Sequence, residues 1–373
     1  MRIYARYALS IGAAAASLAG CGGSQPPIRA AGEMPQALIR SANGDAHKRA
    51  SYLYMAQCCR RLFSNHGNIT VYELQLTGEA LTITKSVFNP SFITVDRTGR
   101  VYMMSLLDSG QGVIEYDAGS KRPSRRIKTP YVVVAATDDS NNLYAAVCPE
   151  CHEYISGKGS INVYEAGTTK LLRVINHGIY SPSALAFDTG GNLYVLNRRK
   201  YGAKTAVLVY APGASKPSRS LPQRYTDISA IALDPSNHLF VVRSPISGAS
   251  SVVEYKAASK HILRTITNGV QSPQAIAFDS SGTLYVSNAP YSSLGWVSVY
   301  APGDSAPSYR ITSGINDPQL LAVDAEGNLY VGNEDYGSSN SDLCVYAPKA
   351  EDPLRCVSYE QYNSPYSLAV RPR

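Results

Sequence analysis

A short hydrophobic triplet centred on Tyr or Phe returns seven times along the 373-residue chain. The triplets begin at Leu53, Val101, Leu143, Leu193, Leu239, Leu284 and Leu329. The successive intervals are therefore 48, 42, 50, 46, 45 and 45 residues. A period in this range indicates a repeat architecture, and a period near 45 residues is typical of four-stranded propeller blades. We therefore expect one closed ring of repeats rather than two separate domains.

The clearest repeat spans residues 272–311 and contains four short apolar runs. Each run is rich in Val, Ile and Tyr and is bounded by Gly, Pro, Asp or Ser. This pattern predicts four strands, a to d. Between strands a and b, Asp279-Ser-Ser-Gly282 predicts a tight turn in which the Asp carboxylate accepts backbone N–H groups and the Gly takes a positive φ. The same turn begins at Asp188, Asp234 and Asp324, so we expect these aspartates to be structural.

One position of strand a is always small, which predicts that this strand lies nearest the axis, where the blades converge. These residues are Thr94, Ala136, Ala186, Ala232, Ala277, Ala322 and Ala369. Strands b and c repeat Tyr instead, which explains why Tyr outnumbers Phe by 27 to 6. We expect these rings to pack between neighbouring sheets while their hydroxyls reach a polar rim.

The first repeat lacks a strand a, because Tyr52-Leu53-Tyr54 follows a segment without an apolar period. The missing strand is supplied by Ser364–Val370, which matches strand a and is followed by no strand b. Pairing this segment with the first repeat removes a free sheet edge. The expected fold is all-β, a seven-bladed propeller over residues 51–373 that is closed by its C-terminal strand.

The N-terminal segment has the features of an export signal. In residues 1–20, Arg2 and Arg6 precede an apolar stretch that is too short for a stable membrane-spanning helix. Leu18-Ala19-Gly20-Cys21 resembles the lipobox of bacterial lipoproteins, which implies cleavage before Cys21 and lipid attachment to Cys21. An ordinary secretory signal is the alternative. Residues 21–50, with much Gly, Ser, Pro and Ala, predict a flexible tether.

This segment also predicts the compartment. Gly22 stands where the retention signal of inner-membrane lipoproteins has Asp, which favours the outer membrane. We expect an exported protein that is lipid-anchored in the bacterial cell envelope. The formal net charge is +7, and removing Arg2 and Arg6 leaves +5 (7 − 2). Since this excess includes no polybasic run, we expect no nucleic-acid partner, and we expect a monomer.

The repeat motif resembles a known family. Leu284-Tyr-Val-x-Asn288 followed by Val297-Ser-Val-Tyr300 resembles the NHL and YVTN-type β-propeller repeats of exported bacterial proteins. The resemblance covers residues 52–373. It implies the propeller fold strongly and the activity hardly at all, because such folds host lactonases, sugar-acid hydrolases and binding platforms.

Cysteine pairing follows from the oxidising compartment, since six cysteines remain when Cys21 is set aside. Cys344 begins strand c of the seventh repeat and Cys356 closes its strand d, so we expect a disulfide across the hairpin. Cys148 and Cys151 would then close a local loop. Cys58 and Cys59 would form a vicinal disulfide or pair with the third repeat, and a metal site built from these cysteines and His152 is a further possibility.

Cys148-Pro-Glu-Cys151-His152 also has the spacing of a c-type haem attachment site. In that alternative, two thioethers hold the haem and His152 is its axial ligand. Against it, the loop is short and polar, and no distal ligand or apolar pocket accompanies the motif.

A second candidate site lies where strands b end, in Asn197, Asn288 and Asn333, and where Asp227 and Asp317 open two strands a. Resemblance to propeller lactonases implies a divalent metal at such a mouth, and hard oxygen ligands suit Ca²⁺. We take Asp227, Asp317 and Asn333 as candidate ligands. The alternative is that these side chains cap turns.

A third candidate is a basic sector in the b–c loops, whose members are Arg60, Arg61, Arg198, Arg199, Lys200, Lys204 and Arg243. It would attract an anionic ligand, although a solvated rim explains the same residues. Trp296, the only tryptophan, would stack on a sugar or pack in the core.

The sequence therefore predicts a lipid-anchored binding module that contacts an envelope protein or glycan through its b–c loop face. The alternatives are a metal-dependent, lactonase-like hydrolase and a c-type haem protein. No Ser-His-Asp arrangement and no G-x-S-x-G motif is present, so we assign no catalytic residue.

Overall fold

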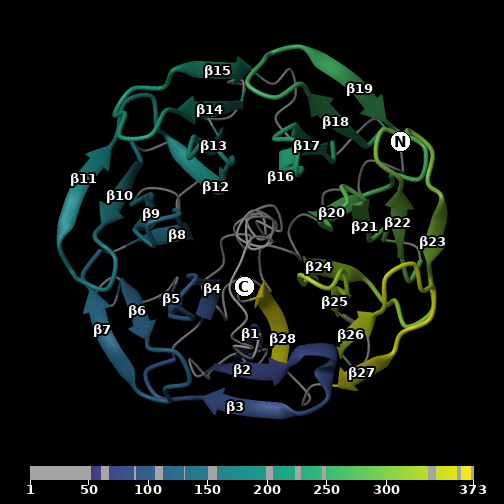
Figure 1. The fold of residues 1–373 in the computed structure, drawn as a ribbon, viewed down its shortest axis with the longest axis horizontal. Helices are drawn as coiled ribbons and strands as arrows, with labels where there is room; N and C mark the ends of the chain where they lie inside the picture. The colour runs from purple at the N-terminus through teal and green to yellow at the C-terminus, as the bar shows by residue number, and fades with distance from the viewer. Residues whose placement is uncertain are drawn as a thin grey trace, which may run out of the picture.

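The computed structural model describes residues 52–59, 67–87, 90–105, 112–129, 131–149, 158–198, 205–222, 228–245, 249–291, 293–334, 342–358 and 363–370. These residues form seven antiparallel sheets of four strands each, arranged as a ring (Figure 1). The fold is a seven-bladed β-propeller, as the repeat period predicted. The described part contains one short 3₁₀ helix, η3 (Leu74–Leu76), and no helix long and apolar enough to cross a membrane.

Each blade runs from an inner strand near the axis to an outer strand at the rim. Blade one contains β28 (Asn363–Val370), β1 (Tyr52–Cys59), β2 (Asn68–Glu73) and β3 (Glu79–Ile83). Blade two contains β4 (Pro90–Val95), β5 (Val101–Ser105), β6 (Val113–Tyr116) and β7 (Pro123–Ile127). Blade three contains β8 (Val132–Thr137), β9 (Leu143–Val147), β10 (Ser160–Tyr164) and β11 (Leu171–Ile175). Blade four contains β12 (Ser181–Phe187), β13 (Leu193–Arg198), β14 (Ala206–Tyr210) and β15 (Arg219–Pro222).

The remaining blades follow the same order. Blade five contains β16 (Ile228–Leu233), β17 (Leu239–Arg243), β18 (Ser251–Tyr255) and β19 (Ile262–Ile266). Blade six contains β20 (Pro273–Phe278), β21 (Leu284–Asn288), β22 (Trp296–Tyr300) and β23 (Tyr309–Ile311). Blade seven contains β24 (Pro318–Val323), β25 (Leu329–Asn333), β26 (Asp342–Tyr346) and β27 (Arg355–Ser358).

The C-terminal strand closes the ring. β28 pairs antiparallel with β1, with Tyr54 opposite Ala369, and a register shift follows Ala56. In Figure 1 the yellow arrow of β28 points toward the centre of the ring. The predicted closure of the ring by the C-terminal strand is therefore confirmed, and the first sheet contains strands from both ends of the chain.

The inner strands pack against one another around the axis. β4, β8, β12, β16, β20, β24 and β28 each contact the inner strands of the neighbouring blades. The six alanines at the small position are buried, with Ala232 and Ala322 at 0% exposure and Ala277 at 1%, and Thr94 is partly buried. Because the blades converge at the axis, a larger side chain there would meet the adjacent sheet.

The predicted a–b turn is present in six blades. In each, the Asp carboxylate accepts the backbone N–H groups two and four residues later, starting from Asp96, Asp138, Asp188, Asp234, Asp279 and Asp324. The fourth residue of each turn has a positive φ and is Gly, except at Asn141 and Asn237. Both asparagines hold the adjacent blade: Asn141 Oδ1 accepts from Arg97 N at 3.0 Å, and Asn237 Oδ1 accepts from Thr189 N at 2.8 Å.

The strand-c tyrosines join neighbouring blades through their hydroxyls. Tyr116, Tyr210, Tyr300 and Tyr346 each donate to a backbone carbonyl in the preceding d–a connection, at 2.7 to 2.9 Å. Their rings are fully buried. The expected packing of the rings is confirmed for these four, and their hydroxyls, which we expected at a polar rim, bond to loop carbonyls. Burial raises the pKa of each phenol.

Candidate functional site

The two ends of the ring differ in how regular their connections are. Every described a–b connection is five residues long, as in residues 96–100, 188–192 and 324–328. The b–c connections vary from residues 199–205 to the longer 148–159. Because the strands alternate in direction, the b–c and d–a connections share one end of the ring. Variable loops on a rigid scaffold are where binding residues concentrate, so the b–c end is the candidate functional face.

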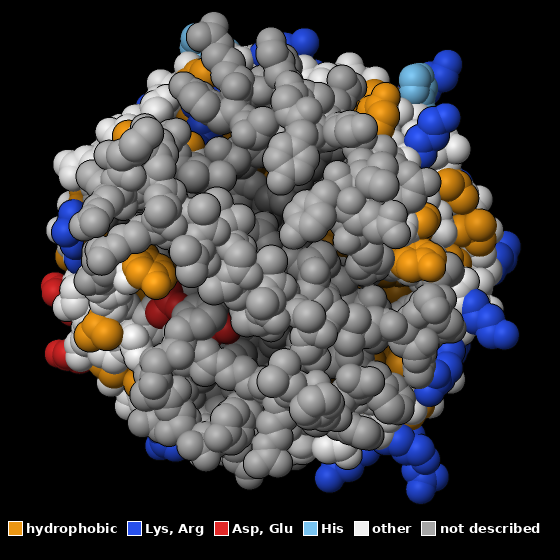
Figure 2. All heavy atoms as spheres, turned by 180° about the vertical axis from the view of Figure 1, so that it is seen from behind, with side chains coloured by type: hydrophobic (Ala, Val, Ile, Leu, Met, Phe, Trp, Pro, Cys, Tyr) orange, Lys and Arg blue, Asp and Glu red, His pale blue; other side chains and the backbone are white. Residues whose placement is uncertain are grey.

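Figure 2 views the ring from behind. Lys and Arg side chains stand around the rim of this view, and acidic side chains are visible to the left of its middle and at its left edge. Of the predicted site residues, those outside the described part are Cys21, Arg60, Arg61, Cys151, His152, Arg199, Lys200, Lys204 and Asp227, and the side chains that would form the predicted Cys58 and Cys59 pairings lie outside it as well. The side chain of Arg198 is also outside it, whereas Arg243 ends β17 and is partly buried.

Asn197, Asn288 and Asn333 lie at the b–c end, buried at the ends of β13, β21 and β25. Each Oδ1 accepts a backbone N–H from the adjacent d–a connection, at 2.8 Å from Tyr180, 2.7 Å from Gln271 and 3.2 Å from Asn316. The amide groups of Asn197 and Asn333 donate back to Gly178 O and Gly314 O. These contacts hold the d–a connections in place. They favour the alternative in which the three asparagines cap turns instead of binding a metal ion.

Blade seven places two acidic residues at the b–c end, Asp317 and Glu334, of which the sequence patterns indicated only Asp317. Asp317 has a φ of 51° and connects two loops: its N donates to Leu294 O at 2.6 Å, and its O accepts from Glu334 N at 3.0 Å. The Asp317 carboxylate accepts from the Gln319 amide at 2.7 Å. Glu334 is only 6% exposed and was missed at the sequence level. Its position directly after the predicted ligand Asn333 was the available signal.

The b–c loop of blade six exposes apolar side chains. Tyr291 and Leu294 are 109% and 65% exposed. At the base of this loop, the Trp296 indole N–H donates to Ser298 Oγ at 3.0 Å, and the Arg310 guanidinium carbon lies 5.0 Å from the ring centroid. One face of Trp296 is therefore occupied by Arg310, while Tyr291 and Leu294 face solvent.

The cysteine pairing is confirmed in blade seven. Cys344 and Cys356 form a disulfide across the β26–β27 hairpin, directly opposite each other in the register. We expected Cys344 to begin strand c and Cys356 to end strand d. Both cysteines instead lie inside their strands, β26 and β27. Cys148 is buried and disulfide-bonded. Its predicted pairing with Cys151 lies outside the described residues.

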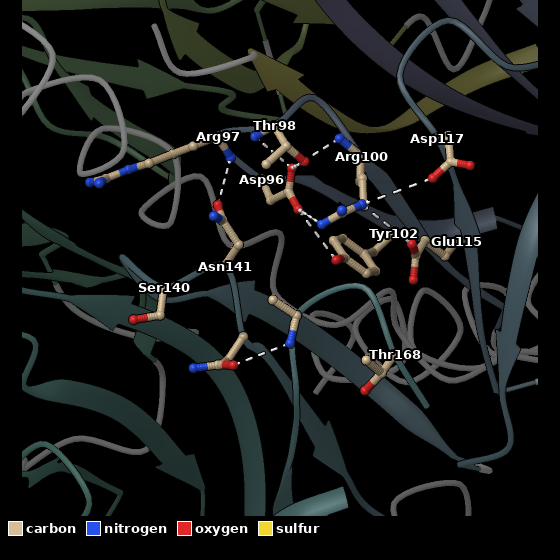
Figure 3. Close-up of polar contacts among 12 residues, drawn as sticks. Asp96, Arg97, Thr98, Arg100, Tyr102, Glu115, Asp117, Ser140, Asn141 and Thr168 are labelled. Atoms are coloured by element: carbon tan, nitrogen blue, oxygen red, sulfur yellow. Dashed lines mark hydrogen bonds and ion pairs between the residues drawn. The ribbon is translucent and has the colours of Figure 1, made fainter. Parts of the chain in front are cut away.

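The opposite end of the ring carries two polar clusters that the sequence motifs did not indicate. In blade two, Arg100 reaches Asp96 at 3.4 Å and Glu115 at 3.6 Å (Figure 3). Arg125 also pairs with Glu115. Both carboxylates are 0% exposed. Burial raises the pKa of Glu115, while Arg125 and Arg100 act to lower it.

Blade five has the equivalent cluster with a histidine in place of Arg100. His238 Nδ1 lies 3.3 Å from Asp234 Oδ2 and 2.9 Å from Glu254 Oε1. Arg264 Nε pairs with the other Glu254 oxygen. Burial raises the pKa of Asp234. The signal was present in the sequence: Glu115 and Glu254 replace a valine that occupies this strand-c position in the other blades, at Val71, Val163, Val209, Val299 and Val345.

Comparison with solved structures supports the fold. No protein-family model and no curated protein matches the sequence. The hydrazine synthase of Kuenenia stuttgartiensis superposes with a TM-score of 0.60 at 13% identity, over 76% of this chain and 90% of that one. A putative 6-phosphogluconolactonase from Bacteroides uniformis superposes with a TM-score of 0.61 at 14% identity, over 87% of this chain and 100% of that one. At this identity the similarity establishes the propeller class alone.

Proposed function

We propose that this propeller is a binding module of the bacterial cell envelope, held to the outer membrane by lipid on Cys21, and that its b–c end contacts an envelope protein or glycan. The export signal and the lipobox-like Leu18–Cys21 segment support the location. The propeller fold is consistent with a binding module.

The observation that carries this proposal is the loop of blade six. A fully exposed tyrosine and a largely exposed leucine, Tyr291 and Leu294, stand within four residues of each other on the variable end. Exposed aromatic side chains form the centres of many binding interfaces, because covering them removes apolar area from water. Tyr in particular combines an apolar ring with a polar tip, which suits contact with either a protein or a sugar.

A pull-down from the envelope fraction of the source bacterium tests this proposal. The immobilised proteins would be the wild type, Tyr291→Ala/Leu294→Ala, and the control Leu171→Ala/Leu172→Ala. The control residues are also exposed, at 47% and 44%, but lie on the outer strand β11. We expect one partner whose capture falls at least about tenfold in the loop variant and is unchanged in the control. Equal capture by all three proteins would contradict the proposal.

The lipid anchor has its own test. Mass spectrometry of the N-terminal peptide should show acyl chains on Cys21, and Cys21→Ser should move the protein from the detergent phase to the aqueous phase. An unmodified N-terminus created by ordinary signal cleavage would exclude the anchor but would leave the binding face untouched.

A lactonase-like hydrolase is the second candidate, favoured by the oxygen groups of Asp317, Gln319 and Glu334 at the b–c end. The named similarity to a putative 6-phosphogluconolactonase is compatible with it. Asp317→Asn should abolish turnover of simple lactones in the presence of Ca²⁺. A folded wild type that turns over no lactone with or without Ca²⁺ would exclude this activity for those substrates. We do not propose the haem alternative, because a thioether would need the Cys148 sulfur that is disulfide-bonded.

A further inference from the structure

We propose that Asp234, His238 and Glu254 form a zinc site at the a–b end of blade five, on the opposite face from the b–c loops. Three atoms lie within 4.8 Å of one another: one imidazole nitrogen of His238, one carboxylate oxygen of Asp234 and one carboxylate oxygen of Glu254. This site is independent of the proposed binding face and has no counterpart in the sequence motifs.

The distances suit a small tetrahedral ion. Zinc–ligand bonds of about 2.1 Å place neighbouring ligand atoms about 3.4 Å apart in a tetrahedron. His238 Nδ1 lies 3.3 Å from Asp234 Oδ2 and 2.9 Å from Glu254 Oε1, so only a small outward shift would admit the ion. One nitrogen and two oxygens suit Zn²⁺ better than Ca²⁺, which takes six to eight oxygen ligands.

The second oxygen of each carboxylate is held by the protein, which orients the first toward the centre of the cluster. Asp234 Oδ1 accepts the backbone N–H groups of Ser236 and His238 at 2.9 and 2.7 Å. Glu254 Oε2 pairs with Arg264 Nε, and Arg264 also donates to Asp304 O in the neighbouring blade. Such outer contacts are the usual support of metal ligands.

Charge and access also fit. Two carboxylates and one guanidinium leave one negative charge beside the imidazole, which favours a divalent cation. The side chains of Asp234 and Glu254 are 14% and 7% exposed, whereas His238 is 28% exposed. The ion would enter past His238, and water would complete the tetrahedron. In blade two, Arg100 fills the equivalent place with its own positive charge, so that cluster is the internal negative control.

Titration of Zn²⁺ into the EDTA-treated full-length protein, followed by calorimetry, tests this proposal. The key variant is His238→Asn, because Asn142, Asn192 and Asn328 occupy this turn position in other blades and donate to the turn aspartate. Glu254→Gln is the second variant, and Glu115→Gln in blade two is the matched control. Circular dichroism confirms that each variant is folded.

We expect one zinc ion per wild-type chain, with affinity reduced about 100-fold or more in His238→Asn and Glu254→Gln and unchanged in Glu115→Gln. Co²⁺ should give the visible absorption of a tetrahedral site in the wild type and in Glu115→Gln but not in His238→Asn or Glu254→Gln, and Ca²⁺ should not bind there. The proposal is overturned if the wild type takes up no zinc, or if His238→Asn and Glu254→Gln bind zinc as tightly as the wild type. If either variant fails to fold, the other decides. The wild-type Co²⁺ spectrum provides a test that needs no variant.

Discussion

Blades two and five place a glutamate at the same buried position of strand c, yet they surround it with different side chains. In blade two, Glu115 lies between Arg100 and Arg125, which carry a permanent charge. In blade five, Glu254 lies between His238 and Arg264, so one of its two partners is an imidazole. The strand-b neighbour differs as well, being Tyr102 in blade two and Phe240 in blade five.

The comparison shows that the propeller repeat accepts a buried charge wherever the same blade supplies its partners. Each glutamate has one partner from the a–b turn, Arg100 or His238, and one arginine from strand d. The other blades have a valine there and need neither. The residue at the last position of the a–b turn, Arg100 or His238, therefore distinguishes the two clusters. An arginine there completes an ion-pair cluster, whereas a histidine leaves the cluster able to accept a further cation.

The largest difference between the two blades should appear when the strand-d arginine is removed. Arg264→Met leaves the buried Glu254 with no permanent positive charge beside it, which should lower the free energy of unfolding by about 3 kcal/mol. Arg125→Met should cost only about 1 kcal/mol, because Arg100 still faces Glu115 and Arg125 is 35% exposed. Urea unfolding of the two variants measures both values. Equal losses would show that Arg100 does not share the charge of Glu115.

The turn cation itself should matter more in blade two. Arg100→Asn removes a charge that faces two fully buried carboxylates, and we expect a loss of about 2 kcal/mol. His238→Asn keeps a donor toward Asp234 and, in zinc-free buffer, should cost less than about 1 kcal/mol. Parallel urea titrations in EDTA test the pair. A greater loss in His238→Asn than in Arg100→Asn would contradict the prediction that the turn cation matters more in blade two.

The two blades should differ in how much stability they lose at alkaline pH, because only blade two has a tyrosine, Tyr102, beside the buried glutamate. Burial, with help from Asp96 and Glu115, raises the pKa of Tyr102 above its ordinary value near 10. The folded state therefore holds this proton more tightly than the unfolded state. Its contribution is complete below about pH 10 and is lost as the pH rises through the folded pKa. Tyr102→Phe should thus reduce the stability lost between pH 8 and pH 11 by about 1 kcal/mol.

The reciprocal change is the control for that prediction. Phe240→Tyr introduces a phenol beside the acidic Asp234 and Glu254, so it should increase the alkaline loss by a similar amount. Urea unfolding at pH 8 and pH 11, with tyrosinate absorbance as a second signal, measures both variants. Identical pH profiles for all three proteins would contradict a buried, high-pKa Tyr102.

The smallest expected effects concern the asparagines that hold adjacent blades. Asn237 makes two hydrogen bonds to Thr189 at 2.8 Å, whereas Asn141 accepts one from Arg97 N at 3.0 Å. Glycine tolerates the positive φ at both positions, so Asn237→Gly and Asn141→Gly isolate the lost side-chain contacts. We expect a loss of about 1 kcal/mol for Asn237→Gly and about 0.5 kcal/mol for Asn141→Gly. Thermal unfolding would contradict this account if either variant were more stable than the wild type.

Much of the architecture could be predicted because it depends on local and periodic signals. The Asp turns, the small residues of strand a and the strand-c tyrosines recur at a fixed place in each repeat, so each copy tests the others. The pairing of β28 with β1 could be predicted because the first repeat lacks a strand a, and the C-terminal segment supplies an additional one. The Cys344–Cys356 disulfide followed from the two strands of one hairpin.

The candidate sites were harder to predict because their members come from different strands or loops. Asn288 and Asn333 carry side-chain oxygens of a kind that can bind a metal ion. Only the folded structure shows that these oxygens accept backbone N–H groups from the d–a connections. Tyr291 and Leu294 have an ordinary loop sequence, and their exposure depends on what surrounds the loop. Glu334 lies beside a predicted ligand but was not recognised, since burial of a charge has no local pattern.

The sequence by itself determined the seven blades, the closure of the ring and the turn chemistry, because these depend on short-range backbone preferences repeated seven times. Only the tertiary structure decided which polar side chains meet. Asp234 and His238 belong to one turn, but Glu254 reaches them because strand c lies beside strand b, and Arg264 reaches Glu254 from strand d. Such contacts depend on sheet register and burial, which set the distances between atoms that are far apart in the chain.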